Sequence, residues 1–295
     1  MTIDIEPLRK TLGTKIEDED VVTRAPLKAM IATFDRQEKV PDEGEPIAPG
    51  WHLCFLHSYA RPAQLGRDGA AFTGGVLPKI PMPRRMYAGS TFTFEGDIRV
   101  GDKLRREIEF ADIQLREGST GTLIVTTQTR RLFTPRGLAL TEAASTVFRE
   151  DPKPGQKSGV PVREAAPAEV PWRRTITPNP VMLFRYSAIT FNPHRIHYDR
   201  TYCLETEGYP GLVVHGPFAQ QCIFDLLRDS TPGRKVKTIA VRARAPLFDT
   251  SPFDVTGRPT ADAHGQVSGA ELWTVTPKGT IATQATATFA QGASS

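Results

Sequence analysis

Helical and strand-like patterns occur in the same order twice along this chain, and this order is the strongest constraint on its fold. In the first half, residues 24–35 carry apolar side chains at positions i, i+3, i+4 and i+7, which predicts an amphipathic helix. Strand-like runs follow at residues 90–98, 102–114, 123–133 and 138–148. The first half is therefore expected to form an antiparallel sheet that curves around one helix.

The second half repeats this order. Pro217 suits the first position of a helix predicted over residues 217–227. Strand-like runs then follow at residues 235–244, 253–257, 265–276 and 280–290. Two halves with the same order of elements indicate an internal duplication and an α+β fold with two antiparallel sheets, each wrapped around a central helix.

A proline-rich segment separates the two halves. Five prolines lie between residues 151 and 172, where no hydrophobic periodicity is visible. Such a composition is typical of a linker. We therefore expect an N-terminal domain over residues 1–150, a linker over 151–171 and a C-terminal domain over 172–295, which a chain of 295 residues is long enough to form.

Composition excludes several classes of protein. Charged residues make up 24% and hydrophobic residues 39% of the chain, as in ordinary globular proteins, and no apolar run reaches the length of a membrane-spanning helix. The first twenty residues lack the pattern of a secretory signal, so a cytoplasmic location is expected. The net charge is only +4, with scattered Lys and Arg, which argues against a nucleic-acid partner.

The three cysteines are not expected to form a disulfide framework or a metal site. Cys54, Cys203 and Cys222 are odd in number and widely spaced. Buried thiols in a reducing compartment are the expected state.

Most side chains suited to catalysis fall between residues 183 and 218. This segment contains three of the six histidines, His194, His197 and His215. Asn192-Pro193 predicts a turn just before them, because a residue that precedes proline favours an extended backbone. Histidine is the side chain best suited to acid–base chemistry near neutral pH, so this turn is the first candidate for an active site.

Gly216 precedes the predicted helix of the second half. Glycine allows a ligand to approach the backbone closely, and the first N–H groups of a helix favour negative charge. An N–H group in this position could stabilise the enolate oxygen that develops on a reacting thioester.

These motifs resemble the MaoC-like (R)-specific enoyl-CoA hydratases and acyl-thioester dehydratases, a family with a double hot-dog fold. The family signature reads Asp-x-Asn-Pro-aliphatic-His-x-Asp, followed later by an aliphatic run and His-Gly. Residues 190–199 (TFNPHRIHYD) and 211–216 (GLVVHG) match this signature in part. Residues 186–199 resemble one branch in particular, which contains itaconyl-CoA hydratases, mesaconyl-C4-CoA hydratases and mitochondrial-type 3-hydroxyacyl-thioester dehydratases.

The first half strengthens this resemblance, which covers most of residues 20–290. Matches to the branch's N-terminal dehydratase-like domain occur at Trp51 and at residues 77–78, 83–86, 88–90, 100–102 and 137–142. His52 and His57 are not followed by an Asn-Pro or His-Gly motif. The first half is therefore expected to be non-catalytic and to shape an acyl tunnel.

The resemblance implies roles for individual residues. His197 takes the position of the general acid/base, Gly216 that of the oxyanion donor and Asn192 that of the family's Asn. Thr190 stands where the family has its catalytic Asp, so the usual Asp/His pair is incomplete. Either Thr190 or Asn192 could position the water, and Asp199 could assist His197 or serve structure alone.

The insertion and the remaining polar residues are candidates for substrate binding. His194 and Arg195 are two extra residues between Asn192-Pro193 and the catalytic histidine position. Arg195 could clamp a carboxylate or a phosphate of CoA, or be solvated. Arg84 and Arg85 are further candidates for the phosphates, and Tyr186 is expected to line the site. His215 is expected to be a neighbour of the oxyanion glycine, and without a third close ligand the histidines do not predict a metal site.

The resulting hypothesis is a hydro-lyase that reversibly hydrates an α,β-unsaturated acyl-CoA. The branch implies a short C5 dicarboxyl substrate such as itaconyl-CoA or mesaconyl-C4-CoA, with CoA as part of the substrate and no separate cofactor. Alternatives are a 3-hydroxyacyl-ACP or -CoA dehydratase of lipid metabolism, a non-catalytic acyl-CoA-binding protein, which Thr190 would favour, and a thioesterase. No membrane partner is expected, and a homodimer is compatible with the family.

Overall fold

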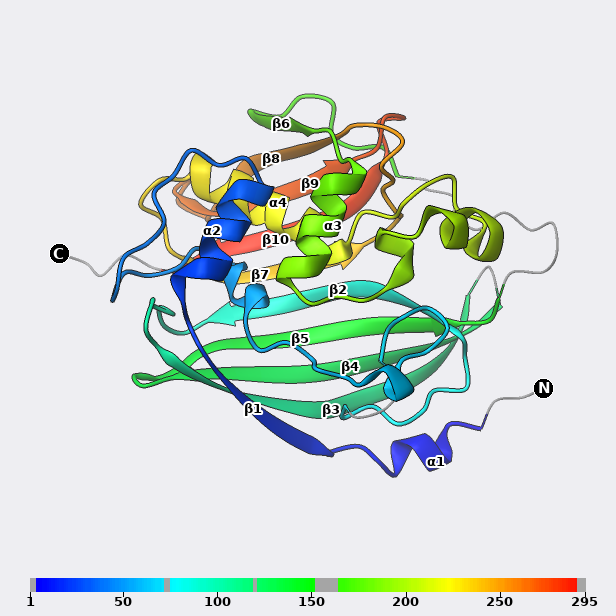
Figure 1. Cartoon of the computed structure of the whole chain (residues 1–295). Helices are drawn as coiled ribbons and strands as arrows, with labels where there is room; N and C mark the ends of the chain where they lie inside the picture. The colour runs from blue at the N-terminus through cyan, green and yellow to red at the C-terminus, as the bar shows by residue number, and fades with distance from the viewer. Residues whose placement is uncertain (1–3, 72–74, 119–120, 152–163, 291–295) are drawn as a thin grey trace.

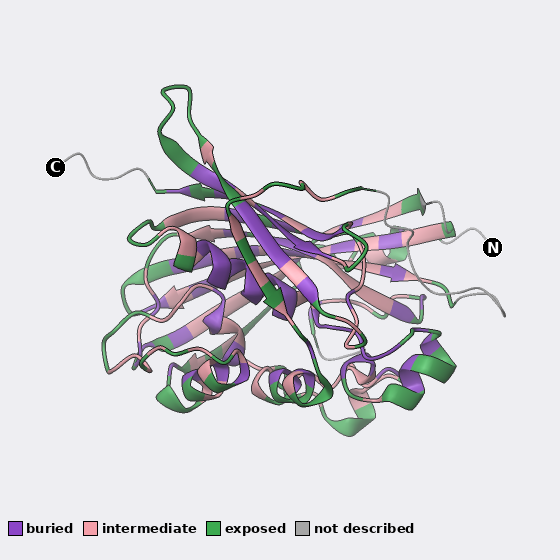
Figure 2. Cartoon of the chain, turned by 90° about the horizontal axis from the view of Figure 1, so that it is seen from above, coloured by how far each residue is buried: buried purple, intermediate pink, exposed green. Residues whose placement is uncertain are grey.

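The computed structural model describes residues 4–71, 75–118, 121–151 and 164–290, which form one antiparallel sheet with helices on one face (Figures 1 and 2). The strands are β1 (Lys15–Val21), β2 (Arg84–Phe94), β3 (Lys103–Gly118), β4 (Gly121–Thr134), β5 (Gly137–Arg149), β6 (Trp172–Ile176), β7 (Val236–Ala243), β8 (Phe253–Ala261), β9 (Val267–Val275) and β10 (Ile281–Phe289). Their order in the sheet is β1-β3-β4-β5-β2-β7-β10-β9-β8-β6.

Within the described residues, four α-helices and four 3₁₀ or π segments accompany the sheet, and the first α-helix is a single turn. They are α1 (Glu6–Arg9), α2 (Arg24–Thr33), α3 (Pro180–Ile189) and α4 (Gly216–Ser230), the 3₁₀ turns η1 (Trp51–Cys54), η2 (Pro62–Gln64) and η3 (Arg195–His197), and the π-helix η4 (Tyr202–Glu207). Both predicted helices and all eight predicted strands are present, which confirms the α+β class.

Eight elements of the described chain were not predicted, and four of them illustrate the reasons. The edge strand β1 is rich in charge and has no apolar face, and β6 begins directly after the proline-rich segment. Helix α3 follows an Asn179-Pro180 start, and the Asn179 side chain accepts a hydrogen bond from the Met182 N–H. The π-helix η4 has no simple signature in the sequence.

The two predicted sheets are continuous, because β2 pairs with β7. The pairing runs from Gly89 opposite Arg242 to Thr93 opposite Thr238. The hydrophobic core also crosses this seam: Leu27 of α2, Phe92 of β2 and Phe224 of α4 belong to one cluster. The halves therefore stabilise one another through backbone hydrogen bonds and through shared apolar burial.

The helices divide unequally between the halves. As predicted for the second half, α4 lies against β6, β8, β9 and β10, and ten of its residues are buried. In contrast, α2 packs against α3 and η1 and lies beside the helices of the second half (Figure 1). The long segment between η1 and β2 instead covers part of β2–β5, and this arrangement leaves space above those strands.

Most of the predicted linker, residues 152–163, lies outside the described residues. The part that follows is attached to the second half. Ala165 forms a β-bridge with Thr280, and Ala166 and Val170 pack near Trp273.

Cys54, Cys203 and Cys222 are buried, free thiols, as predicted, and the reducing compartment stays a prediction. Within the described ranges, no helix is both long enough and apolar enough to cross a membrane.

Gly89 lies at the seam between the halves and should be sensitive to substitution. Its φ is +145°, and a Cβ atom there would overlap the carbonyl oxygen of Val241 on β7. Gly89→Ala should lower the free energy of unfolding by about 1–3 kcal/mol, measured by urea denaturation. Gly96→Ala is the matched control, because its Cβ would lie 3.8 Å from its nearest neighbours. Equal stability of the two variants would contradict the role assigned to Gly89.

Candidate active site

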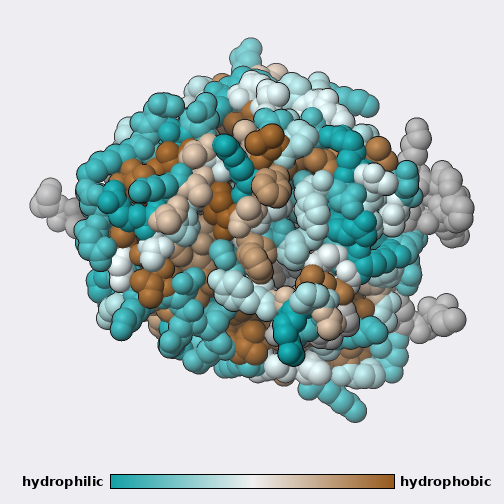
Figure 3. Space-filling model, in the orientation of Figure 1, coloured by the Kyte–Doolittle hydropathy of each residue, from teal (hydrophilic) through white to brown (hydrophobic). Residues whose placement is uncertain are grey.

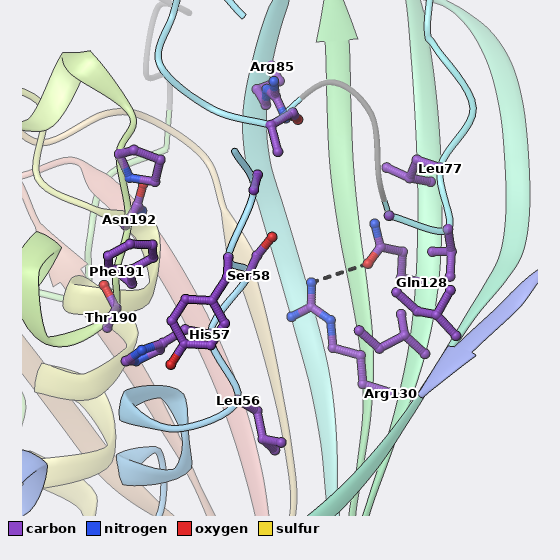
Figure 4. Close-up of a pocket in the computed structure, with 18 of the residues that line it drawn as sticks. Leu56, His57, Ser58, Leu77, Arg85, Gln128, Arg130, Thr190, Phe191 and Asn192 are labelled. Carbon is purple, nitrogen blue, oxygen red and sulfur yellow. Dashed lines mark hydrogen bonds between the residues drawn. The ribbon is translucent and has the colours of Figure 1, made fainter. Parts of the chain in front are cut away.

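A cavity of about 1070 Å³ lies between the strands of the first half and the turn that follows α3. This volume is at the upper end of the range for small-molecule sites. On the face shown in Figure 3, small apolar patches are interspersed with hydrophilic side chains. Figure 4 shows the cavity in close-up, with Arg130 and Gln128 on one wall and Thr190, Phe191 and Asn192 on the other.

The first-half wall contains an ion pair between the half-buried Arg130 and the buried Glu142. Arg130 Nη1 lies 3.1 Å from Glu142 Oε2, and the Ser90 hydroxyl donates to Glu142 Oε1 at 2.7 Å. Burial acts to raise the pKa of Glu142, but Arg130, the Ser90 hydrogen bond and nearby His52 outweigh it, so the pKa lies below its usual value. Glu142 is therefore ionised at neutral pH although it is only 6% exposed.

The second-half wall is formed by the turn that ends α3. Thr190 is the C-cap residue of this helix, and its hydroxyl donates to the Tyr186 carbonyl at 2.7 Å. Phe191 has a φ of +48°, a left-handed conformation that is strained for an aromatic residue. Asn192 Oδ1 accepts a hydrogen bond from the His194 N–H at 3.0 Å. The predicted Asn-Pro turn is present, and it places Thr190 and Asn192 in the cavity wall together with the buried Tyr186.

The three histidines of the motif gather beside this wall but do not line the cavity. His197 stacks on His215 with 3.6 Å between ring centroids, and His194 meets His197 edge-on at 5.4 Å. His197 Nδ1 lies 2.7 Å from the Val213 carbonyl, so it carries the proton and leaves the Nε2 lone pair available as a base. Burial lowers the pKa of His197 to about 3 and keeps the imidazole neutral.

His215, the second ring of the stack, is held in place by Ser187. One of its ring nitrogens, Nε2, lies 2.8 Å from the Ser187 hydroxyl. Burial lowers its pKa well below the usual value. As expected, His215 is a direct neighbour of Gly216, where α4 begins.

Gly216 is covered by a residue of the first half. A Cβ atom at this position would overlap the ring of Tyr87 on β2, whose hydroxyl donates to Gln220 Oε1 at 2.6 Å. The next residue, Pro217, lines the cavity. The start of α4 therefore lies at the cavity, with Tyr87 packed against its first glycine.

Asp199 and Arg195 pair with each other. Arg195 Nη2 lies 2.7 Å from Asp199 Oδ2, and the guanidinium lies over the Tyr202 ring at 4.2 Å. Asp199 Oδ1 accepts from the Tyr202 N–H at 2.9 Å, and this bond, followed by that to Arg195, lowers its pKa. Asp199 thus contacts Arg195 and the first residue of η4, and neither the Asp199 nor the Arg195 side chain contributes to the cavity lining.

Arg85 does line the cavity, but its guanidinium is engaged with the covering segment. It contacts Asp68 Oδ2 at 3.1 Å and the Ala71 carbonyl at 2.7 Å. These contacts hold the segment at the cavity rim. In the parts of the chain that the structure describes, no three His, Cys, Asp or Glu side chains are grouped as metal ligands.

The cavity residues of the first half that were not predicted as site residues include His52, His57, Arg130 and Glu142. The strands did contain a signal for two of them. Arg130 on β4 and Glu142 on β5 face each other across the ladder, at inward positions where alternation leads one to expect apolar residues. Charged residues at such positions indicate a functional interior rather than a purely structural one.

Solved structures establish the fold. A MaoC-like dehydratase from Phytophthora capsici covers 99% of this chain and 100% of its own, with a TM-score of 0.65 and 13% identity. A Mycobacterium tuberculosis protein described as a double hot-dog covers 95% of this chain and 96% of its own, with a TM-score of 0.58 and 11% identity. The predicted double hot-dog fold is confirmed.

Sequence similarity narrows the class. The chain is 38% identical over 256 residues to mesaconyl-C(4)-CoA hydratase of Chloroflexus aurantiacus, which covers 85% of this chain and 89% of the relative. The fold and this similarity define a hydro-lyase of the double hot-dog class that acts on an acyl thioester. Within that class the chain belongs to the family of hydroxyacyl-thioester dehydratase type 2, whose model matches residues 50–249. The predicted resemblance is thereby confirmed.

Proposed function

We propose that this enzyme reversibly hydrates a C5 dicarboxyl enoyl-CoA thioester of the mesaconyl-C4-CoA type. The observation that carries this proposal is the 38% identity to mesaconyl-C(4)-CoA hydratase over nearly the whole of both chains. The cavity supports it, because it combines an apolar lining with a charged pair, Arg130 and Glu142, on its inner wall. A short acyl group with a second carboxylate needs both kinds of surroundings.

His197 is the proposed base. In the direction of hydration, Nε2 would accept a proton from water as the water oxygen bonds to Cβ, and the proton would then pass to Cα. The Val213 carbonyl supports this role, because it fixes the required tautomer through Nδ1. The Gly216 N–H, at the start of α4, is the proposed donor to the enolate oxygen of the thioester.

This mechanism requires one local rearrangement. The cavity wall contains Thr190, Phe191 and Asn192, whereas His197 is only 6% exposed and does not line the cavity. Catalytic contacts often tighten only when substrate binds. The wall that would have to move contains the strained backbone of Phe191, whose relaxation would favour such a movement. We propose that substrate binding shifts this turn and brings His197 Nε2 to the acyl group.

The first test is a comparison of mesaconyl-C4-CoA, itaconyl-CoA and crotonyl-CoA with the purified enzyme. We expect the absorbance of the enoyl thioester to fall and the mass to rise by one water, fastest with a dicarboxyl substrate. Release of free thiol would indicate a thioesterase instead. Binding without turnover of any substrate would contradict the hydratase proposal and favour a binding protein.

A dehydratase of lipid synthesis is the second candidate. It is favoured by the family model and by a stretch of 81 residues that is 37% identical to the mitochondrial hydroxyacyl-thioester dehydratase of Schizosaccharomyces pombe and covers 27% of each chain. Faster turnover of long monocarboxyl 3-hydroxyacyl thioesters than of dicarboxyl substrates would favour this alternative. The cytoplasmic location and the homodimer stay predictions.

A further inference from the structure

Four of the described residues that line the cavity carry a buried polar atom without a partner. His52 Nε2, His57 Nε2, Arg130 Nε and the Tyr186 hydroxyl each lack a hydrogen-bond partner among the described residues, and all four residues line the cavity. A buried polar group that loses its water without gaining a partner destabilises the fold. Unsatisfied atoms in the wall of a cavity are groups that a polar ligand could pair with.

Arg130 is the cation of this wall with donors to spare. Its Nη1 is directed at Glu142, whereas its other edge holds only a weak contact of 3.4 Å from Nη2 to Gln128 Oε1, and Nε has no partner within the described ranges. The Nε–Nη2 edge of a guanidinium matches the two oxygens of a carboxylate. An acid group that displaces the Gln128 amide would therefore find a bidentate partner.

Arg106, another arginine of the cavity lining, is already occupied, as is Arg85. Arg106 forms a two-point ion pair with Asp18 of β1 and also donates to the Leu56 carbonyl at 2.7 Å. These contacts bind the edge strand and the η1 segment to β3. Of Arg106 and Arg130, Arg130 is therefore the arginine available to bind a ligand.

Glu142 orients Arg130 rather than saturating it. Its Oε1 accepts from Ser90 and its Oε2 from Arg130 Nη1, so both carboxylate oxygens have donors. Arg130 and Glu142 are paired across β4 and β5, which fixes the guanidinium relative to the sheet. Glu142 is thus a positioning residue that leaves the opposite edge of Arg130 for a ligand.

We propose that Arg130 binds the free carboxylate of the acyl group and makes the enzyme selective for dicarboxyl over monocarboxyl thioesters. This inference rests on the proposed function, because it assigns the second carboxylate of that substrate class to a residue of the first half. The first half would then supply substrate recognition, and the motif of the second half would supply acid–base chemistry.

The test compares the binding of succinyl-CoA and butyryl-CoA, which are saturated and cannot be hydrated. In the unmodified enzyme, calorimetry should show tighter binding of succinyl-CoA. Arg130→Met should lower the ratio of the two affinities by at least about 30-fold, because a charge-assisted bidentate contact is lost. The affinity ratio of Arg130→Lys should lie between those of the unmodified enzyme and Arg130→Met, since lysine keeps the charge without the planar fork.

Two further variants separate recognition from folding. Arg130→Met with Glu142→Gln removes both charges of the pair, so no unpaired carboxylate remains buried. Arg131→Met is the matched control, because Arg131 is the neighbouring residue on β4 and pairs with Glu109 outside the cavity lining. An unchanged affinity ratio in both the single and the double variant would overturn the proposal.

This measurement is independent of turnover. If the unmodified enzyme hydrates no enoyl-CoA but Arg130→Met still abolishes the preference for succinyl-CoA, the proposed function fails and the carboxylate site stands. If the enzyme hydrates mesaconyl-C4-CoA while Arg130→Met keeps the full preference, the function stands and the carboxylate site fails.

Discussion

Replacing His197 by glutamine should lower kcat/KM for hydration by about 10²–10⁴-fold, the usual contribution of a positioned general acid/base. Glutamine can still donate to the Val213 carbonyl, but it cannot accept a proton from water. Because burial holds the pKa of His197 at about 3, the imidazole is in its basic form throughout the neutral range. The measurement is steady-state kinetics with whichever enoyl-CoA the enzyme hydrates fastest.

The control for this experiment is His264→Gln, which changes a histidine in the exposed turn between β8 and β9. Its kcat/KM should stay within about twofold of the unmodified enzyme, as expected for a surface change. Circular dichroism should show that both variants are folded. Activity of His197→Gln within about tenfold of the unmodified enzyme would rule out His197 as the base.

His57 is then the residue to examine next. It lines the cavity, its Nε2 is buried without a partner in the described part of the chain, and its ring stacks on Phe191 at 6.0 Å. Loss of activity in His57→Gln but not in His197→Gln would move acid–base catalysis to the first half. The opposite pattern would support the rearrangement of the turn that carries Phe191.

Local patterns in the sequence were sufficient for most of the fold. The strands β2–β5 and β7–β10 alternate clearly, and α4 begins at a Gly-Pro pair, so hydrophobic periodicity and start signals located them. The Asn192 turn was also predictable, since it depends on neighbouring residues alone. Pairing of β2 with β7 was not predictable in this way, because it joins segments about 150 residues apart.

The same distinction applies to the site. The motif from Thr190 to Asp199 is local, and the sequence identified it by resemblance. The cavity wall is not local: it joins Arg130 of β4 with the turn at Asn192, and this depends on how the two halves pack. Asp199 shows the limit of a motif, because proximity in sequence to His197 did not predict its pairing with Arg195.

Acidification between pH 7 and pH 5 should destabilise the protein by several kcal/mol. Burial lowers the pKa of His52 to about 4, that of His194 to about 4 and that of His197 to about 3, and it lowers that of His215 as well. Unfolded histidine has a pKa of about 6.5. As the pH falls below this value, the unfolded chain binds protons that the folded chain does not, so the free energy of unfolding decreases.

The size of the effect follows from the same linkage. Each of these histidines should cost about 1–2 kcal/mol by pH 5, and the loss should continue until the pH approaches the folded pKa values near 4 and 3. Carboxylates contribute little to this window, because their unfolded pKa values lie near 4. Urea denaturation at pH 7, 6 and 5 should show a steady decrease in the midpoint.

A variant can assign part of this slope to one residue. His52→Gln removes one buried imidazole and should reduce proton uptake on unfolding near pH 5 by about one. Since His52 lies beside Glu142 in the cavity wall, its variant also tests whether that wall is a source of acid lability. A free energy of unfolding that is constant from pH 7 to pH 5 would show that the buried imidazoles accept protons within the folded protein.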